Sequence, residues 1–141
     1  MLEELTEQLR RDEGEVRHAY QDHLGYWTIG IGRLIDKRRG GGLTKEECTY
    51  LLENDINKRH KELQQRISWF NNLDDARQGV LLNMAFQMGV EGLLGFKTTL
   101  KCIEAGKYED AAENMSKSLW ASQTPVRANR LIKQMITGEW Q

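Results

Sequence analysis

One long helical repeat constrains this chain more than any other feature. Apolar residues recur at the 3.6-residue helical period from Cys48 to Ile67. Just before them, Thr44 and Glu47 match a capping box, in which each side chain binds the other residue's backbone N–H. The pattern therefore predicts a single long helix over residues 44–67.

The segment in front of this helix changes period. Leucines at helical spacing predict a first helix over residues 2–12, ended by Gly14. Between residues 16 and 35 apolar and other residues alternate, which is strand patterning. Asp22–Gly25 resembles a turn, so a small hairpin or meander is expected here. In this pattern Thr28 lies on the face opposite Ile29 and Ile31. The Lys37–Gly42 run reads as a flexible basic loop.

All segments after the long helix are helical. Asp74 or Asp75 is expected to cap an apolar central helix, Val80–Met88, and shorter helices are expected over 93–103, 108–120 and 125–136. The sequence thus predicts an α+β, mostly helical, two-lobed fold. A small β-containing lobe (13–45) and a connecting helix (44–67) lead to a helical lobe (68–141), to which the N-terminal helix 1–12 is added.

Composition excludes several classes of protein. The chain has 141 residues and a net charge of −1, which argues against a general nucleic-acid binder. Cys48 and Cys102 are expected to be buried or half-buried free thiols. The three histidines have no ligand-like companions, so no metal is expected. No apolar run is long enough to span a membrane, and the charged N-terminus is not a secretory signal.

Three residues of the small lobe could form a hydrolytic site. Glu13 lies at the carboxyl end of the first helix, where the helix dipole disfavours ionisation and suits a general acid. Asp22 lies in the predicted turn and Thr28 on the strand. Glycoside hydrolysis uses such a carboxyl pair, and the hydroxyl could help the second carboxylate hold a water. Taken singly, each has an ordinary explanation as a surface glutamate, a turn aspartate and a strand threonine.

Two arginines near the C-terminus share a helix face. Thr124 is expected as the N-cap and Pro125 as the first residue of this helix. Arg127 and Arg130 follow at i and i+3, where two cations oppose the helix dipole. We expect Asp12 and Glu13 to compensate them. An arginine beside Glu13 would favour its ionised form, against the effect of the helix end.

The motifs together resemble T-even-type bacteriophage lysozymes, endolysins of the glycoside hydrolases. The resemblance starts at Asp12–Gly14, Asp22 and Gly25–Gly32, and continues through Asn83–Gly89 and Gln123–Arg130 to the closing Thr137–Trp140. It covers nearly the whole chain. It implies a cofactor-free muramidase that cleaves the β-1,4 bond between N-acetylmuramic acid and N-acetylglucosamine of peptidoglycan.

The resemblance also implies roles for individual residues. Glu13 matches the general acid, Asp22 the second carboxylate and Thr28 the hydroxyl that positions water. An inverting mechanism would place the two carboxyl groups about 6.5 to 9.5 Å apart. Substrate-contact positions match Leu34, Phe86, Thr99 and Asn114, and supporting positions match Gln87, Arg127 and Arg130, with Arg127 pairing with the catalytic glutamate.

The sequence departs from the family in places. Arg33 stands where a histidine is frequent, and the segment from Leu34 to Thr44 is short, so we expect a more open cleft rim. With a net charge of −1, attraction to the anionic wall would come from a local patch, for which Arg33, Lys37, Arg38 and Arg39 are candidates.

The resemblance further implies a biological setting. It predicts a monomer in the host cytoplasm that reaches peptidoglycan glycan strands once a separate holin-like protein permeabilises the membrane. Three alternatives stay open: a lytic transglycosylase using Glu13 alone, a non-catalytic wall-binding module of a virion, and a helical protein–protein adaptor.

Overall fold

The computed structural model describes all residues, 1–141, as two compact units, Met1–Leu51 and Leu52–Gln141. Seven α-helices and one three-stranded antiparallel sheet confirm the predicted α+β, mostly helical class. We call the two units the sheet unit and the helical unit. The predicted grouping of helix 1–12 with the helical lobe stays a prediction.

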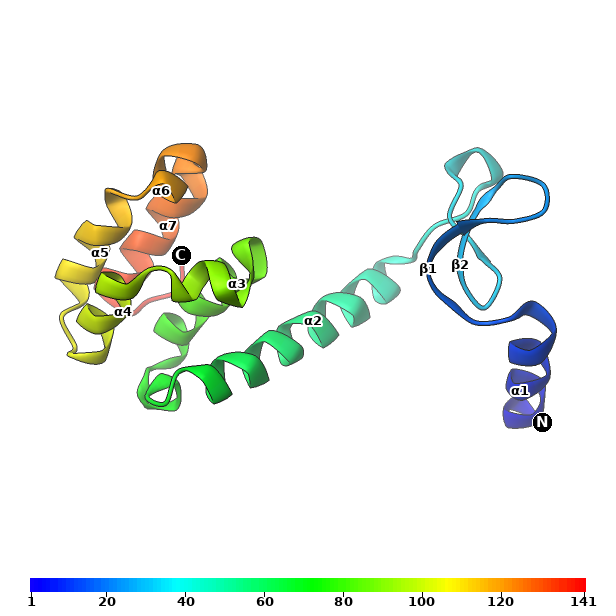
Figure 1. Cartoon of the computed structure of the whole chain (residues 1–141), viewed down its shortest axis with the longest axis horizontal. Helices are drawn as coiled ribbons and strands as arrows, with labels where there is room; N and C mark the ends of the chain where they lie inside the picture. Colours follow the sequence, from blue (N-terminus) through cyan, green and yellow to red (C-terminus); the bar gives the residue numbers. More distant parts are fainter. The chain divides into compact units, whose positions relative to one another are not determined.

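The sheet unit begins with the expected helix. Helix α1 (Leu2–Glu13) ends at Gly14, which has a positive φ of 77° and donates its N–H to Arg10 O. Strands β1 (Val16–Gln21), β2 (Trp27–Gly30) and β3 (Arg33–Leu34) follow in the order β1-β2-β3 (Figure 1). The predicted turn at Asp22–Gly25 is confirmed by the Gly25 N–H, which donates to Asp22 O.

The strand expected from the alternating sequence is interrupted at one point. The alternation continues past Gly30, but β2 ends there and the chain turns through Ile31 and Gly32 before β3. Gly30 and Gly32 have φ values of 71° and 72°, a region that residues with a Cβ rarely adopt. The glycines thus convert one expected strand segment into a second hairpin.

The prediction of a flexible loop at Lys37–Gly42 is wrong for its first half. Lys37–Arg39 form the 3-10 helix η1, capped by the buried Asp36, whose Oδ1 accepts the Arg38 N–H at 2.9 Å. Gly42 then donates its N–H to Leu34 O. A Cβ at Gly41 would lie 2.3 Å from the same carbonyl oxygen, so glycine is required for this close return to β3.

The long helix α2 (Lys45–Arg66) starts as predicted. Thr44 Oγ1 accepts the Glu47 N–H at 3.1 Å, and Glu47 Oε1 accepts the Thr44 N–H at 2.9 Å, which completes the capping box. The apolar repeat is buried only toward its end, at Leu63 and Ile67, whereas its earlier members stay exposed: Cys48, Leu51, Leu52 and Ile56. Cys102 is half-buried as expected, but the prediction that Cys48 is buried or half-buried is wrong, because it is exposed.

The helical unit packs five further helices around one core (Figure 1). After the short 3-10 helix η2 (Phe70–Asn72) come α3 (Asp75–Leu94), α4 (Lys97–Glu104), α5 (Tyr108–Ser116), α6 (Leu119–Gln123) and α7 (Pro125–Thr137). The fully buried large side chains of this core are Leu63, Phe70, Val80, Leu81, Met84, Leu93, Ile103, Met115 and Met135.

Three helix ends in this unit differ from or refine the sequence predictions. Asp74 caps α3, since its Oδ2 accepts the Arg77 N–H at 3.2 Å. The helix expected over 108–120 is broken at Lys117, because Ser118 caps a separate helix, α6. Pro125 is the first residue of α7, but the Thr124 hydroxyl donates to Trp120 O instead of capping that helix.

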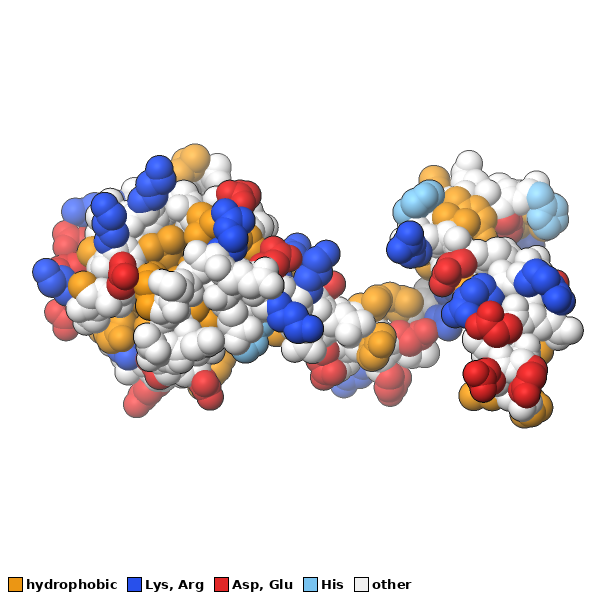
Figure 2. All heavy atoms as spheres, turned by 60° about the horizontal axis from the view of Figure 1, so that its bottom comes forward, with side chains coloured by type: hydrophobic (Ala, Val, Ile, Leu, Met, Phe, Trp, Pro, Cys, Tyr) orange, Lys and Arg blue, Asp and Glu red, His pale blue; other side chains and the backbone are white.

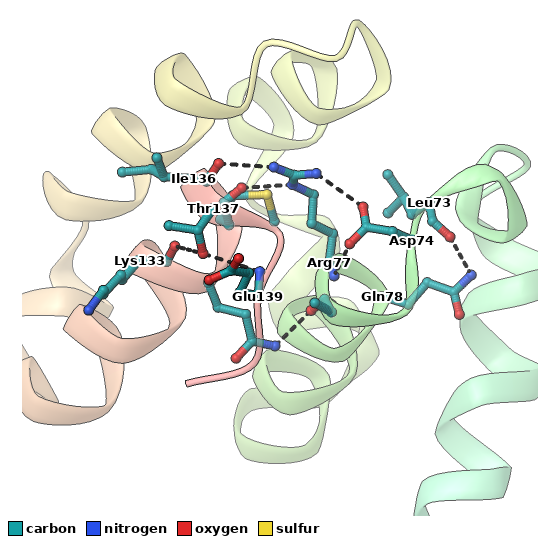
Figure 3. Close-up of polar contacts among 11 residues, drawn as sticks. Leu73, Asp74, Arg77, Gln78, Lys133, Ile136, Thr137 and Glu139 are labelled. Atoms are coloured by element: carbon teal, nitrogen blue, oxygen red, sulfur yellow. Dashed lines mark hydrogen bonds and ion pairs between the residues drawn. The ribbon is translucent and has the colours of Figure 1, made fainter.

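One arginine joins the start of α3 to the end of α7 (Figure 3). Arg77 near the start of α3 donates from Nε to Met135 O at 2.8 Å and from Nη2 to Ile136 O at 2.9 Å. Its Nη1 pairs with Asp74 Oδ1 at 3.1 Å, and the guanidinium carbon lies 3.6 Å from the Tyr108 ring centroid. The carbonyls that end α7 thereby accept hydrogen bonds from a cation, whose positive charge also interacts favourably with the negative end of the helix dipole.

Charges of both signs are interspersed on the face shown of each unit (Figure 2). No single helix combines the length and apolar character needed to cross a membrane. Helices α3 and α4, which meet at a bend of 101°, together reach the length and apolar composition of such a span. The buried apolar residues of this pair belong to the core described above.

Candidate active site

Glu13 is the last residue of α1, and its side chain lies against the β2–β3 turn. A Cβ built on Gly32 would come within 3.0 Å of Glu13 Oε2 and 3.3 Å of its Cδ. A Cβ built on Gly30 would meet nothing within 4 Å. The exposed carboxyl of Glu13 therefore has a defined neighbour in the β2–β3 turn, at Gly32.

Asp22 is half-buried at the end of β1, in the first hairpin. Its Oδ1 accepts two backbone N–H groups, from Leu24 and from Tyr26, both at 2.9 Å. Its own backbone N–H donates to Tyr26 O. This Asx-turn geometry fixes the carboxylate, while Oδ2 accepts no hydrogen bond within the chain and can accept one from a water.

Thr28 is buried, with 5% of its surface exposed, and its hydroxyl donates to Tyr26 O at 3.1 Å. Asp22 and Thr28 thus bind groups of the same residue, one its N–H and the other its carbonyl. In the sheet Thr28 lies opposite Leu34 on one side and Tyr20 on the other. Residues directly opposite each other share a face, so the structure brings predicted residues Thr28 and Leu34 together.

Tyr20 is a member of this row that sequence reasoning missed. Between Val16 and Tyr20 the register of β1 shifts against β2, where Val16 pairs with Gly30 and Tyr20 with Thr28. This bulge changes which residue of β1 lies opposite Thr28. The two-residue periodicity of a strand does not reveal such a register shift from the sequence. Only the observed register places the half-buried Tyr20 beside Thr28.

Arg33 is held by an ion pair at the start of β3. Its Nη1 donates to Gly42 O at 3.2 Å and lies 2.8 Å from Glu47. The arginine hydrogen bond, followed by the Thr44 N–H, lowers the pKa of Glu47 to about 2. Arg33 therefore links β3 to the start of α2 and is not a free cation of the expected wall-binding patch.

The predicted substrate-contact residues of the helical unit lie on three helices. Phe86 on α3 is 46% exposed, whereas Thr99 on α4 is buried at 4%. Asn114 on α5 is half-buried and donates from Nδ2 to Asp110 O at 3.0 Å. An exposed aromatic ring can contact a ligand directly, while Thr99 offers little surface. Their substrate contacts stay predictions.

The three supporting residues have partners or neighbours within the helical unit. Gln87 Oε1 accepts the Trp120 indole N–H at 2.9 Å, and Trp120 packs edge-to-face on Phe96. Arg127 donates from Nε to Asn83 Oδ1 at 2.9 Å and from Nη2 to Asn83 O at 3.2 Å.

Arg127 and Arg130 also line one pocket together with Asn83. Sequence reasoning gave Asn83 no role, although it belongs to the Asn83–Gly89 motif. The expected compensation of the two arginines by Asp12 and Glu13 stays a prediction. No three His, Cys, Asp or Glu side chains gather where they could hold a metal ion.

Comparison with known proteins identifies the family of the chain. A family model described as phage lysozyme matches residues 10–134. The probable T4-type lysozyme 1 of Dictyostelium discoideum is 35% identical over 164 residues, covering 98% of this chain and 96% of that protein. The pre-baseplate central spike protein Gp5 of Enterobacteria phage T4 is 36% identical over 95% of this chain but only 28% of its own length.

A third relative is more distant. The peptidoglycan hydrolase gp36 of Pseudomonas phage phiKMV is 28% identical over 83% of this chain and 13% of its own length. Together with the carboxyl-bearing sheet unit, these matches define a glycoside hydrolase. More specifically, the chain belongs to the phage lysozyme family.

Proposed function

We propose that the protein is a muramidase that hydrolyses the β-1,4 bond between N-acetylmuramic acid and N-acetylglucosamine with inversion at the anomeric carbon. The observation that carries this is Asp22, whose Oδ1 is fixed by two backbone N–H groups while Oδ2 is left to accept from a water. The family membership and the relatives named as lysozymes and peptidoglycan hydrolase support cell-wall glycan as the substrate.

In this mechanism the two carboxyl groups have different tasks. Glu13 donates its proton to the glycosidic oxygen as the bond breaks. Asp22 accepts a hydrogen bond from a water on the opposite face of the sugar and removes its proton during attack. The buried Thr28 hydroxyl, two residues after the Tyr26 N–H that binds Asp22, helps position that water.

Neutral variants of the two acids test this assignment. Glu13→Gln and Asp22→Asn are both expected to abolish clearing of a bacterial wall suspension while wall binding is retained. Thr28→Ser, which keeps the hydroxyl, is the matched control for Thr28→Ala. Full activity of either neutral acid variant would contradict the mechanism.

The products of wild-type digestion separate hydrolysis from transglycosylation. Hydrolysis leaves a reducing N-acetylmuramic acid, whereas a lytic transglycosylase leaves an anhydro-sugar end. Mass spectrometry of digested peptidoglycan is expected to show reducing ends only. A wild-type protein that binds walls without releasing fragments would instead favour a non-catalytic wall-binding module.

We further propose that Leu34, Phe86, Thr99 and Asn114 contact the glycan.

The biological setting is proposed from the sequence resemblance. The protein is a monomer that accumulates in the host cytoplasm and lyses the wall at the end of a phage cycle, after a holin-like protein opens the membrane. Light scattering tests the monomer. Expression with and without a holin tests the export route, since lysis without a holin would contradict it.

A further inference from the structure

The face of the sheet opposite Thr28 carries an exposed tryptophan. Because neighbouring residues of a strand point to opposite faces, Trp27 lies on the other side of β2 from Thr28. The residue is 46% exposed. Trp27 O accepts the Ile35 N–H at 2.9 Å, and both residues line a pocket with Asp36, Lys37 and Arg38. A large aromatic ring left open beside cations is a feature that the catalytic site does not use.

Cations are concentrated in this part of the chain, although neither the sheet unit as a whole nor the whole protein is basic. Residues 16–45 contain six Lys or Arg residues against two Asp or Glu residues, while the whole chain has a net charge of −1. The cations of this segment are Arg17, Arg33, Lys37, Arg38, Arg39 and Lys45. The segment thus supplies the local positive charge that an anionic polymer requires.

The structure shows which of these cations are free to bind an anion beside Trp27. Arg38 forms a two-point ion pair with the buried Asp36, and this hydrogen bonding lowers the pKa of Asp36 to about 2. Lys37 is exposed and has no carboxylate partner. Arg39 also lacks a carboxylate partner, but its guanidinium carbon lies 4.3 Å from the Tyr26 ring centroid and it does not line this pocket.

We propose that Trp27 and Lys37 form an accessory wall-binding site, separate from the catalytic carboxyls, that takes a carboxylated glycan. A sugar ring stacks on the exposed indole, and a carboxylate of the wall's peptide groups binds Lys37. Charge complementarity argues for this occupant, and η1 holds Lys37 at the edge of the pocket. The proposal rests on the proposed cell-wall substrate and adds a second contact to it.

Binding of the full-length Glu13→Gln protein to purified peptidoglycan sacculi tests the site. Adding Trp27→Ala is expected to weaken binding about tenfold, or about 1.4 kcal/mol, and adding Lys37→Glu about fivefold at low salt. Leu24→Ala, which removes a 64% exposed apolar side chain from the same hairpin, and Lys45→Glu are the matched controls. The controls are expected to stay within twofold of the parent.

Salt and chemical modification separate the two contributions. Raising the salt concentration to about 1 M, where charges more than about 3 Å apart are screened, should abolish the Lys37 effect and leave the Trp27 effect. Sacculi whose carboxylates are amidated should show the same loss. Loss of the Lys37 effect after removal of phosphate polymers alone would overturn the choice of carboxylates.

The proposal fails if Trp27→Ala binds as its parent does, or if Lys37→Glu is no weaker than Lys45→Glu. Clearing activity in the background of an intact Glu13 distinguishes the two levels of inference. If the wild type does not clear walls, the proposed function fails. If the wild type clears walls, and the Trp27→Ala and Lys37→Glu variants clear dilute suspensions as fast as the wild type, only the accessory site fails.

Discussion

Two glycines of the β2–β3 turn form a matched pair for testing the role of Glu13. Gly30 and Gly32 have nearly the same φ, 71° and 72°. An alanine at either position must adopt the left-handed region, which costs about 1–2 kcal/mol and is partly offset by a less flexible unfolded chain. We therefore expect Gly30→Ala and Gly32→Ala to lower the free energy of unfolding similarly, by about 1 kcal/mol.

The two substitutions differ in what the new methyl group meets. At Gly30 nothing lies within 4 Å, whereas at Gly32 the Cβ would lie 3.0 Å from Glu13 Oε2 and 3.3 Å from its Cδ. The exposed carboxyl can yield by a few tenths of an ångström at little cost in stability. Because catalysis depends on placement of the acid, we expect Gly32→Ala to lose about tenfold in wall hydrolysis.

Initial clearing rates, corrected for the folded fraction from urea unfolding, measure the difference. Gly30→Ala is expected to retain the wild-type rate, and Gly32→Ala is expected to bind walls normally while clearing them slowly. Equal rates for the two variants, whether both high or both low, would refute the claim that the turn positions Glu13.

Three further perturbations test other parts of the structure. Because the Arg33 ion pair depresses the pKa of Glu47 from its ordinary 4.5 to about 2, its stabilisation is present above pH 4.5 and is lost toward pH 2. Arg33→Ala should therefore lower the urea midpoint at pH 7 but not near pH 2, and a constant difference would contradict the pairing. Arg77→Ala should cost about 2–3 kcal/mol in urea unfolding. Arg77→Lys should recover only part of this, because a single ammonium lacks the planar fork that contacts both α7 carbonyls and Asp74 while it stacks on Tyr108. Leu63→Ala should cost about 2–5 kcal/mol, whereas Leu51→Ala on the same helix, at a site 47% exposed, should cost less than about 1 kcal/mol; similar losses would contradict the assigned core.

Local chemistry made much of the sheet unit predictable. The capping box at Thr44 and Glu47, the stop at Gly14 and the turn at Asp22 each depend on residues close together in the chain. The second hairpin was not predictable from alternation, because the period continues through Gly30 and Gly32 and only their positive φ reveals the turn.

The site was predictable to a smaller extent. Glu13, Asp22 and Thr28 were identified by residue type and by family motif, and the structure places all three in the sheet unit. The bulge in β1 that brings Tyr20 beside Thr28 leaves no mark in the sequence. Contacts between distant segments, such as Asn83 with Arg127, depend on tertiary packing in the same way.

The division of labour between Glu13 and Asp22 is tested most directly by the anomer first released from the wall glycan. Proton NMR recorded during the first minutes of digestion resolves the two anomers before they equilibrate. The account predicts that the new reducing end appears as the α-anomer, because a water bound to Asp22 attacks the face opposite the β-linked leaving group. A β-anomer at the start would show that the configuration is retained and would contradict the role assigned to Asp22.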